Sequence, residues 1–208
     1  MSEVLLHTNV FSPYGWTARM VAAEKGVPHR IVAVDTSSPA HRRLHPFGKM
    51  PVLEHGRMIV YETLAIAHYL DRAFDGPPLQ PDDVVGQTDV LRWISVVNGY
   101  CFAVMNGLVK ERTAGSWRAE PTNEATIESL RGPLAMQLSL IGEAVADRPY
   151  LTGEAFTLAD AFLFPQLHFA AFTPEGSEAL AAAPAVEAWL QRVRARPSFA
   201  ATNPFVGG

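Results

Sequence analysis

The spacing of apolar positions changes along the chain. In the first third, short apolar runs of strand length alternate with stretches of helical spacing. From about residue 84 onward, apolar residues recur every three or four positions, which is the spacing of amphipathic helices. We therefore predict a first part in the order βαβ, short α, ββα, followed by a part made of helices.

Residues that favour helix starts and turns divide the first part into elements. Ser12 and Pro13 mark a helix start, because serine caps a helix N-terminus and proline suits its first position. Gly26 ends that helix, and His55-Gly56 forms the turn of a hairpin. In chain order we predict a strand at 3–7, a helix at 13–25, a strand at 29–34, a short helix at 39–44, the hairpin, and a helix capped by Thr63.

A proline-rich stretch separates the two parts and predicts three segments. These are a first domain at 1–76, a linker at 77–84 and an all-α domain at 85–208. The helices expected in the second domain span residues 84–112, 123–146 with a bend near Pro133, 157–172 and 184–194. Thr157, with Asp160 three positions later, has the spacing of a capping box.

Composition and charge argue against some classes of function. The 208 residues include 48% hydrophobic ones, which suffices for two modest cores, and the net charge of −4 without a basic block argues against a nucleic-acid partner. The sequence has neither a long apolar run nor a signal-peptide pattern, so we expect no membrane association. The single cysteine fits a reducing cytosol, and we expect a cytoplasmic protein.

The hairpin carries the most informative residues. Pro51 opens its first strand and cannot donate to the ladder, so the Met50 backbone before it is left to pair with something else, such as an extended peptide. An X-Pro bond is also readily cis. Taken alone, Pro51 is better explained as an ordinary edge-strand proline. Glu62 and Thr63 follow at the start of the next helix.

An ordered set of short motifs resembles the glutathione transferase family. The motifs are residues 12–14 (SPY), 38–41 (SPAH), 45–53 (HPFGKMPVL), 62–63 (ET) and 156–161 (FTLADA). The resemblance is to bacterial, serine-type members with phi- and theta-like glutathione-site motifs. It implies a thioredoxin-like α/β N-terminal domain with a mixed sheet, an all-α C-terminal domain, and an enzyme of the glutathione S-transferase type that uses glutathione as co-substrate.

Ser12 is the candidate catalytic residue. Its place at a helix N-terminus predicts a hydroxyl near unpaired backbone N–H groups, where a thiolate of glutathione would be stabilised by a hydrogen bond and by the helix dipole. Tyr14 is the second choice, because some branches of the family use tyrosine. Without the other motifs, Ser12 would simply be an N-cap.

The resemblance also implies the residues that bind glutathione. Glu62 and Thr63 match the pair that holds the γ-glutamyl end, and Met50 before Pro51 matches the backbone that pairs with the cysteinyl unit. His41 and Lys49 stand where the family's plant-type and related bacterial members contact the glycine carboxylate. His45 replaces the usual asparagine.

The residues expected to line the second-substrate pocket, for a small hydrophobic electrophile, are Tyr14, Tyr100, Met105, Asn106 and Trp117. Phe205 is a candidate lid over that pocket.

His41 and His45 have the four-residue spacing of two metal ligands on a helix, but no third ligand is evident nearby and we predict no metal. The resemblance implies a homodimer. Peroxide reduction or isomerisation by the same thiolate stays open, as does a transferase-like binding or regulatory protein without catalysis.

Overall fold

The computed structural model describes residues 2–117 and 119–205, with the side chain of Trp117 outside the described part. Contacts divide these residues into two compact units. The first comprises residues 2–79 and 195–205, and the second comprises residues 80–194. The predicted helical domain at 85–208 differs from the second unit at its end, because the last helix of the chain packs in the first unit.

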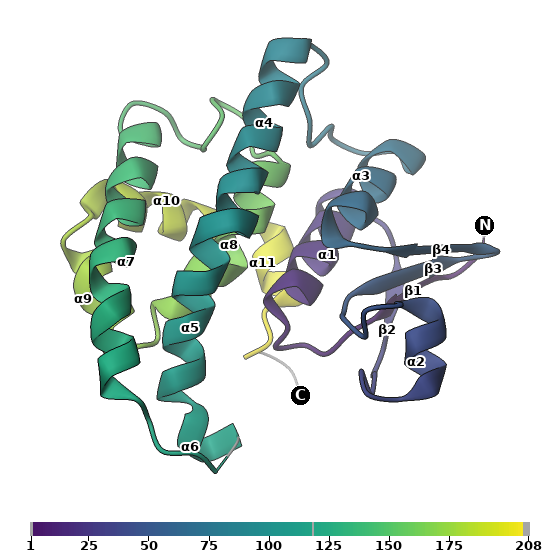
Figure 1. The fold of residues 1–208 in the computed structure, drawn as a ribbon. Helices are drawn as coiled ribbons and strands as arrows, with labels where there is room; N and C mark the ends of the chain where they lie inside the picture. The colour runs from purple at the N-terminus through teal and green to yellow at the C-terminus, as the bar shows by residue number, and fades with distance from the viewer. Residues whose placement is uncertain (1, 118, 206–208) are drawn as a thin grey trace. The chain divides into compact units, whose positions relative to one another are not determined.

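The first unit is built on a mixed four-stranded sheet (Figure 1). Its strands are β1 (Val4–His7), β2 (His29–Val32), β3 (Val52–His55) and β4 (Met58–Tyr61). β1 lies parallel to β2 and antiparallel to β3, and β3 lies antiparallel to β4, in the order β2-β1-β3-β4. Leu6 pairs with Leu53 across the two central strands, and both side chains are fully buried. The predicted thioredoxin-like arrangement is confirmed.

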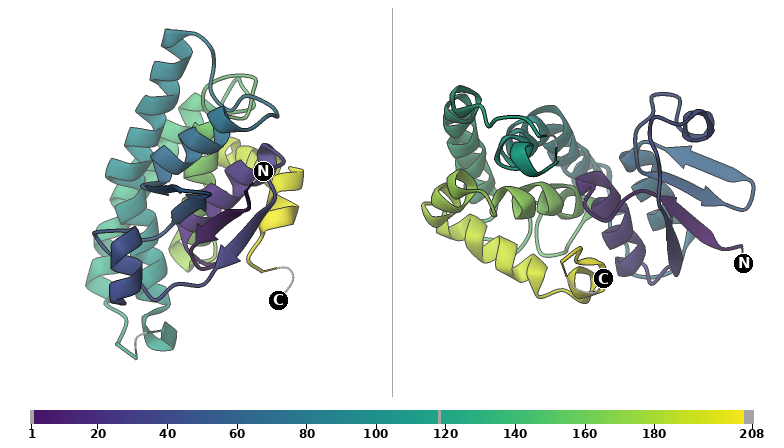
Figure 2. Two further views of the ribbon diagram at one scale, coloured as in Figure 1. Left: turned by 90° about the vertical axis from the view of Figure 1, so that its right-hand side faces the viewer. Right: turned by 90° about the horizontal axis from the view of Figure 1, so that it is seen from below.

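Four helices complete the first unit (Figure 2). They are α1 (Pro13–Glu24), α2 (Pro39–Leu44), α3 (Thr63–Ala73) and α11 (Pro197–Thr202). α1 packs against both α3 and α11. The side chains of α1 from Trp16 to Ala22 are all buried, which explains why this helix lacks a clear polar face in the sequence.

The second unit contains only helices among its described residues. α4 (Val84–Val96), a π-helical segment η1 (Val97–Cys101) and α5 (Phe102–Arg112) follow one another without a break where the sequence predicted one long helix. The other helices are α6 (Ala114–Trp117), α7 (Glu124–Ala144), α8 (Leu158–Ala170), α9 (Pro174–Ala181) and α10 (Pro184–Arg194). The sequence did not predict α6, α9 or η1.

α8 forms the centre of the second unit. Almost every side chain along it is buried, and it packs against α4, α5, α9 and α10. The predicted capping box is confirmed, with Thr157 N–H donating to Asp160 Oδ2 at 3.0 Å. Asp160 also accepts from Leu151 N at 3.0 Å and from Trp189 Nε1 at 2.8 Å. Its buried carboxylate is therefore held by hydrogen-bond donors from three segments.

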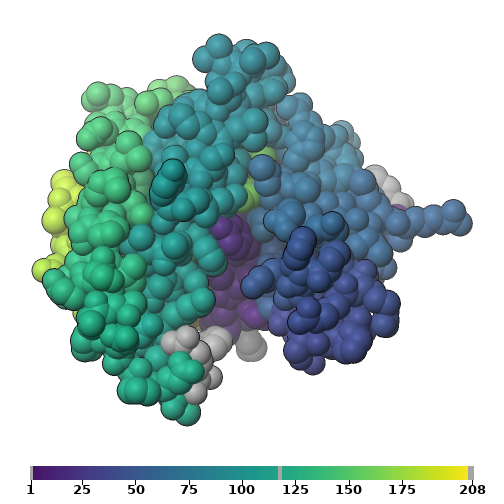
Figure 3. Space-filling model, viewed as in Figure 1, coloured from purple at the N-terminus to yellow at the C-terminus, as the bar shows by residue number. Residues whose placement is uncertain are grey.

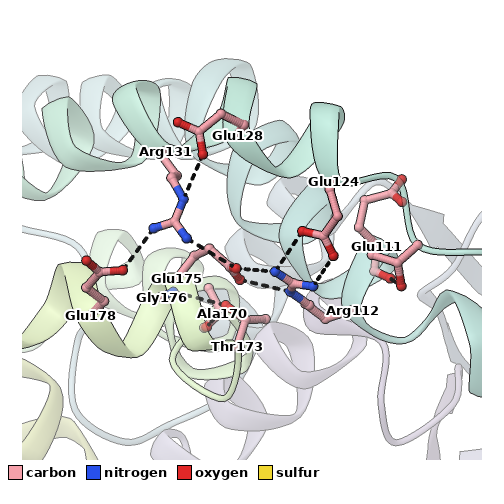
Figure 4. A network of polar contacts seen from close by, with 11 residues as sticks. Glu111, Arg112, Glu124, Glu128, Arg131, Ala170, Thr173, Glu175, Gly176 and Glu178 are labelled. Carbon is pink, nitrogen blue, oxygen red and sulfur yellow. Dashed lines mark hydrogen bonds and ion pairs between the residues drawn. The ribbon is translucent and has the colours of Figure 1, made fainter.

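An ionic network ties α5, α7 and α9 together (Figure 4). Glu175 of α9 is almost fully buried and accepts from the guanidinium of Arg112, which also binds Glu124 at 2.8 Å. Arg131 of α7 lies 3.6 Å from the same Glu175 carboxylate and pairs with Glu178 at 2.9 Å. The two arginines therefore balance one buried carboxylate between them.

Candidate active site

Ser12 lies at the N-terminus of α1, where the chain turns after β1. Its backbone is extended (φ −70°, ψ 119°), and its Oγ accepts a hydrogen bond of 3.1 Å from Gly15 N. A serine hydroxyl has one proton and two lone pairs, so an oxygen that accepts from an N–H keeps its proton to donate. The half-buried Ser12 hydroxyl is thus placed to donate to an acceptor beside the helix N-terminus.

Close packing of the helix end against β1 holds Ser12 in this position. A Cβ at Gly15 would lie 2.0 Å from Thr8 Oγ1 and 3.1 Å from Ser12 Cβ. Thr8 is fully buried and cannot move aside easily. Position 15 therefore accepts only glycine without a shift of the turn that carries Ser12.

A buried cation lies under the same turn. Arg19 is 3% exposed, and its Nη1 donates to Val10 O at 3.3 Å. Burial lowers the pKa of Arg19 to about 10, so the guanidinium remains protonated at neutral pH. Arg19 both fixes the backbone two residues before Ser12 and contributes positive charge to this part of the unit.

The segment before β3 matches the prediction from the sequence. The Met50-Pro51 peptide bond is cis. The paired residues of β3 begin at Val52, opposite Tyr61 of β4, so the Met50 backbone lies outside the ladder. Met50 therefore lies at the end of the sheet where β1 and β4 also end.

Glu62 and Thr63 lie where β4 passes into α3, and one expectation about them was wrong. Glu62, and not Thr63, is the N-cap of α3, and its side chain makes no cap hydrogen bond. Glu62 is exposed and has φ 71° and ψ 120°, a left-handed backbone conformation that costs about 1–3 kcal/mol for a residue other than glycine. Thr63 is buried at the first helical position. Strain of this kind often marks a functional position.

The side chain of His41, on α2, contacts the backbone of the turn before β3. Its ring is only 4% exposed, and its Nε2 lies 2.6 Å from Lys49 O. The side chain is therefore directed into the turn and holds the backbone of Lys49. Lys49 itself is exposed. α2 and the turn after it, dark blue in Figure 3, form part of the surface of the first unit.

Arg42 is a cation at this turn that the sequence analysis did not name. It is exposed, and its guanidinium carbon lies 3.5 Å from the position a Cβ would take at Gly48. His45 is buried against Tyr61, with ring centroids 5.0 Å apart, and burial lowers its pKa. No cluster of three metal-ligating side chains occurs among the described residues.

The residues predicted for a second substrate are divided between the units. Tyr14 is half-buried in the first unit. In the second unit Tyr100 is 66% exposed on η1 and Asn106 is half-buried, but Met105 is fully buried in the core and lines no surface. The side chain of Trp117 lies outside the described residues.

Phe11, which precedes Ser12 in the chain, packs against Phe205 in the first unit. Phe11 and Phe205 have ring centroids 5.9 Å apart, and both are substantially exposed. The sequence singled out Phe205 but not Phe11. An exposed pair of rings beside a candidate nucleophile site offers apolar surface to a ligand.

Comparison with known proteins agrees with this geometry. The family model described as glutathione S-transferase, N-terminal domain, matches residues 11–73, and the model of the C-terminal domain matches residues 124–192. Glutathione S-transferase 3 of Zea mays is 30% identical over 211 residues, covering 97% of this chain and 94% of that protein. Glutathione S-transferase F14 of Arabidopsis thaliana is 27% identical over 189 residues, covering 86% of this chain and 74% of that protein.

A solved structure of glutathione S-transferase III in its apo form matches with a TM-score of 0.89 at 28% identity, covering 100% of this chain and 98% of that one. The fold is thus that of a thioredoxin-like domain joined to a helical domain. The chain belongs to the glutathione S-transferase family and is an enzyme of that type. No helix among the described residues is long and apolar enough to cross a membrane.

Proposed function

We propose that the first unit binds glutathione and that Ser12 activates its thiol as a thiolate for attack on a small hydrophobic electrophile. One observation carries this proposal. The Ser12 hydroxyl accepts from Gly15 N at the N-terminus of α1, which leaves its proton for a sulfur placed there.

The energies involved are sufficient for this role. A free thiol has a pKa of about 8.5, so only a few per cent is ionised at neutral pH. A hydrogen bond to a charged group contributes about 1.5–3 kcal/mol, and a helix N-terminus adds about 0.3–1 kcal/mol. Since each pKa unit corresponds to about 1.4 kcal/mol, these terms lower the thiol pKa by about two. Most of the bound thiol is then ionised at neutral pH.

Other groups of the first unit suit the remaining parts of glutathione, namely its γ-glutamyl end, its cysteinyl backbone and its glycine carboxylate. Glu62 would attract the ammonium of the γ-glutamyl end, while the N–H groups at the start of α3 receive its carboxylate. The Met50 backbone, outside the sheet ladder, would pair with the cysteinyl unit. Lys49 and Arg42 are the exposed cations for the glycine carboxylate, and His41 acts indirectly by holding Lys49.

An electrophile would bind against aromatic surface near Ser12. Phe11 and Phe205 supply exposed rings in the first unit, with Tyr14 on the first turn of α1. Flat apolar surface of this kind suits small hydrophobic molecules. The same thiolate is chemically able to reduce a hydroperoxide, so an activity panel of aryl halides, epoxides and hydroperoxides identifies the reaction.

We also propose a homodimer. β4 is an edge strand, and exposed apolar side chains lie on it and on the turn before β3, namely Phe47, Met58, Ile59 and Tyr61. Exposed apolar patches on an edge strand are unusual unless another surface covers them. Light scattering at micromolar concentration tests this, and a monomer would contradict it.

A cytoplasmic setting is proposed on the chemistry of the cysteine. Cys101 is buried in η1, and burial raises its pKa to about 11. Such a thiol neither reacts readily nor forms a disulfide, as expected in a reducing compartment.

Replacement of Ser12 by alanine tests the mechanism. The Ser12→Ala variant should raise the pKa of the bound glutathione thiol by about one to two, measured from the ultraviolet absorbance of the thiolate. Ser38→Ala is a matched control, because Ser38 also precedes a proline and caps α2 by accepting from His41 N at 3.1 Å. An unchanged thiol pKa in Ser12→Ala would refute the role of Ser12, with Tyr14→Phe the next variant to measure.

Titration with glutathione tests the proposal as a whole. Saturable binding at or below millimolar concentration, together with turnover of an electrophile, supports a catalytic transferase. Binding that is undetectable at millimolar concentration would instead support a transferase-like docking or regulatory protein.

A further inference from the structure

Asn9 connects the two segments on which the proposed glutathione site depends. It lies in the turn between β1 and α1, and its side-chain amide contacts the segment before β3. Asn9 Nδ2 donates to Met50 Sδ at 3.4 Å, and Asn9 Oδ1 accepts from Phe11 N at 3.0 Å. The two residues are 41 positions apart in the sequence.

The orientation of the amide follows from its partners. The Phe11 backbone N–H can only donate, so the oxygen of the Asn9 amide must face it. The amide nitrogen then faces the thioether of Met50, which is a weak acceptor. Neither aspartate nor alanine at position 9 would make both contacts.

The backbone of Asn9 also supports Ser12. Asn9 O accepts from Ser12 N at 3.3 Å and from Thr8 Oγ1 at 3.2 Å. One residue therefore holds the main chain of Ser12 through its carbonyl and the side chain of Met50 through its amide. These are the two points between which the cysteinyl unit of glutathione would lie.

We propose that Asn9 is a positioning residue that sets the spacing between the Ser12 hydroxyl and the Met50 backbone. This rests on the proposed function, and Asn9 is not expected to touch the reacting sulfur. Its amide acts through Met50, so its loss allows the Met50 segment to move relative to Ser12. Small displacements between binding groups weaken binding substantially, since the ligand then satisfies one group or the other.

A double-mutant cycle on the full chain tests the proposal. Asn9→Ala removes the donor to sulfur, Met50→Leu removes the sulfur while keeping the backbone and an apolar side chain, and the double variant closes the cycle. Asn9→Ala also removes the acceptor of Phe11 N, so the control variant must remove a backbone-to-amide hydrogen bond of that kind alone. We expect Asn9→Ala to weaken glutathione binding by about threefold to tenfold in calorimetry, which corresponds to the energy of about one hydrogen bond. In the double variant, Met50→Leu should weaken glutathione binding little beyond the effect of Asn9→Ala, because both substitutions remove the contact between Asn9 and Met50.

The control is Asn123→Ala, which removes a hydrogen bond of the same kind, from Thr126 N to Asn123 Oδ1 at 3.1 Å, in the second unit. Thermal unfolding of all variants separates binding from stability. Asn9→Ala should bind glutathione more weakly than Asn123→Ala at equal stability.

The outcomes separate the two proposals. Suppose that the wild-type protein binds glutathione. The role of Asn9 alone is then overturned if Asn9→Ala binds glutathione equally well, or if the effects of Asn9→Ala and Met50→Leu on the binding free energy are fully additive. Wild-type protein that binds no glutathione at millimolar concentration overturns the proposed function, and the role of Asn9 falls with it. Weaker binding with a non-additive cycle establishes Asn9 as a positioning residue.

Discussion

The indole N–H of Trp16 donates a hydrogen bond of 2.8 Å to Thr202 Oγ1, a residue 186 positions later in the chain. Both residues are buried, and the rings of Trp16 and Phe199 lie 6.1 Å apart. Arg196 adds an ion pair of 2.7 Å with Glu24, at the other end of α1. α11 is thus anchored along the helix that carries Ser12 at its start.

This contact allows a prediction for the replacement of Thr202. Thr202→Val keeps the shape of the side chain but removes the hydroxyl that accepts from the buried Trp16 N–H, which should lower the free energy of unfolding by about 1–3 kcal/mol. Urea unfolding followed by tryptophan fluorescence measures it. Thr88→Val, on the exposed face of α4, is the control and should change stability by less than about 0.5 kcal/mol. Equal stability of the two variants would contradict the prediction.

Gly15 should not tolerate a side chain. Gly15→Ala places a methyl group where Thr8 Oγ1 already lies, so we expect a loss of about 1–3 kcal/mol in stability and a displaced Ser12. Gly132→Ala is the control, because Gly132 lies inside α7 with open space around its Cβ position. That variant should gain about 0.5–1 kcal/mol, since alanine favours helix more than glycine. A neutral Gly15→Ala would show that the turn adjusts freely.

The ionic network around Glu175 should make the free energy of unfolding decrease at acidic pH. The hydrogen bonds from Arg112 hold the pKa of Glu175 below its usual range, so its contribution is present above the ordinary glutamate pKa and is lost as pH falls through the lowered value. Glu175→Gln should therefore cost about 1–3 kcal/mol at pH 7 and progressively less in acid.

Glu178→Gln is the matched control for this network. Glu178 also pairs with Arg131, but its side chain is 74% exposed. Its replacement should change stability by less than about 1 kcal/mol, as for other surface ion pairs. If Glu175→Gln and Glu178→Gln prove equally mild in urea unfolding, the buried carboxylate does not stabilise the packing of α5, α7 and α9.

His168 should add a second pH dependence at milder acidity. It lies buried among phenylalanine rings, and burial, together with the nearby Arg194 charge, lowers its pKa to about 3. Below the ordinary histidine pKa of about 6.5 the unfolded chain binds a proton that the folded chain excludes. Folding stability should therefore fall as pH decreases from about 6.5 toward 3, by at most about 1.4 kcal/mol per pH unit.

The variant His168→Gln isolates this effect. Glutamine keeps an acceptor for Arg194 Nε, which lies 3.2 Å from His168 Nδ1, but it does not titrate. Unfolding free energies measured between pH 7 and pH 4.5 should show a shallower pH dependence in the variant than in the wild type. Parallel curves would mean that His168 takes up its proton over the same pH range in the folded and the unfolded chain.

Local signals in the sequence predicted elements well where caps and prolines mark them. The helices at residues 39–44 and 184–194 occur with the predicted bounds, and Thr157 with Asp160 forms the predicted capping box. Such signals act within a few residues, so they are present in the sequence regardless of the fold. The predicted hairpin and the position of Met50 before the first paired residue of β3 arise from equally local features.

Other features depend on contacts with residues far away in the sequence and were not predicted. The π-helical turn at Val97–Cys101 interrupts a run whose apolar spacing looks continuous in the sequence. Thr63 appeared to be a cap, but Glu62 adopts a left-handed backbone and takes that position. The contact of His41 with Lys49 O was not predicted either. Each depends on how neighbouring elements close around the residue.

The sequence by itself determined the order of strands and helices within residues 1–76, the N-cap at Ser12 and the motif that places Met50 before Pro51, because these follow from periodicity and from the geometry of single residues. Only the tertiary structure decided that α11 packs on α1, that Asn9 contacts Met50, and which cations of the α2 segment remain exposed. Those outcomes depend on contacts between residues far apart in the chain, and no local pattern records which side of a helix such contacts will cover.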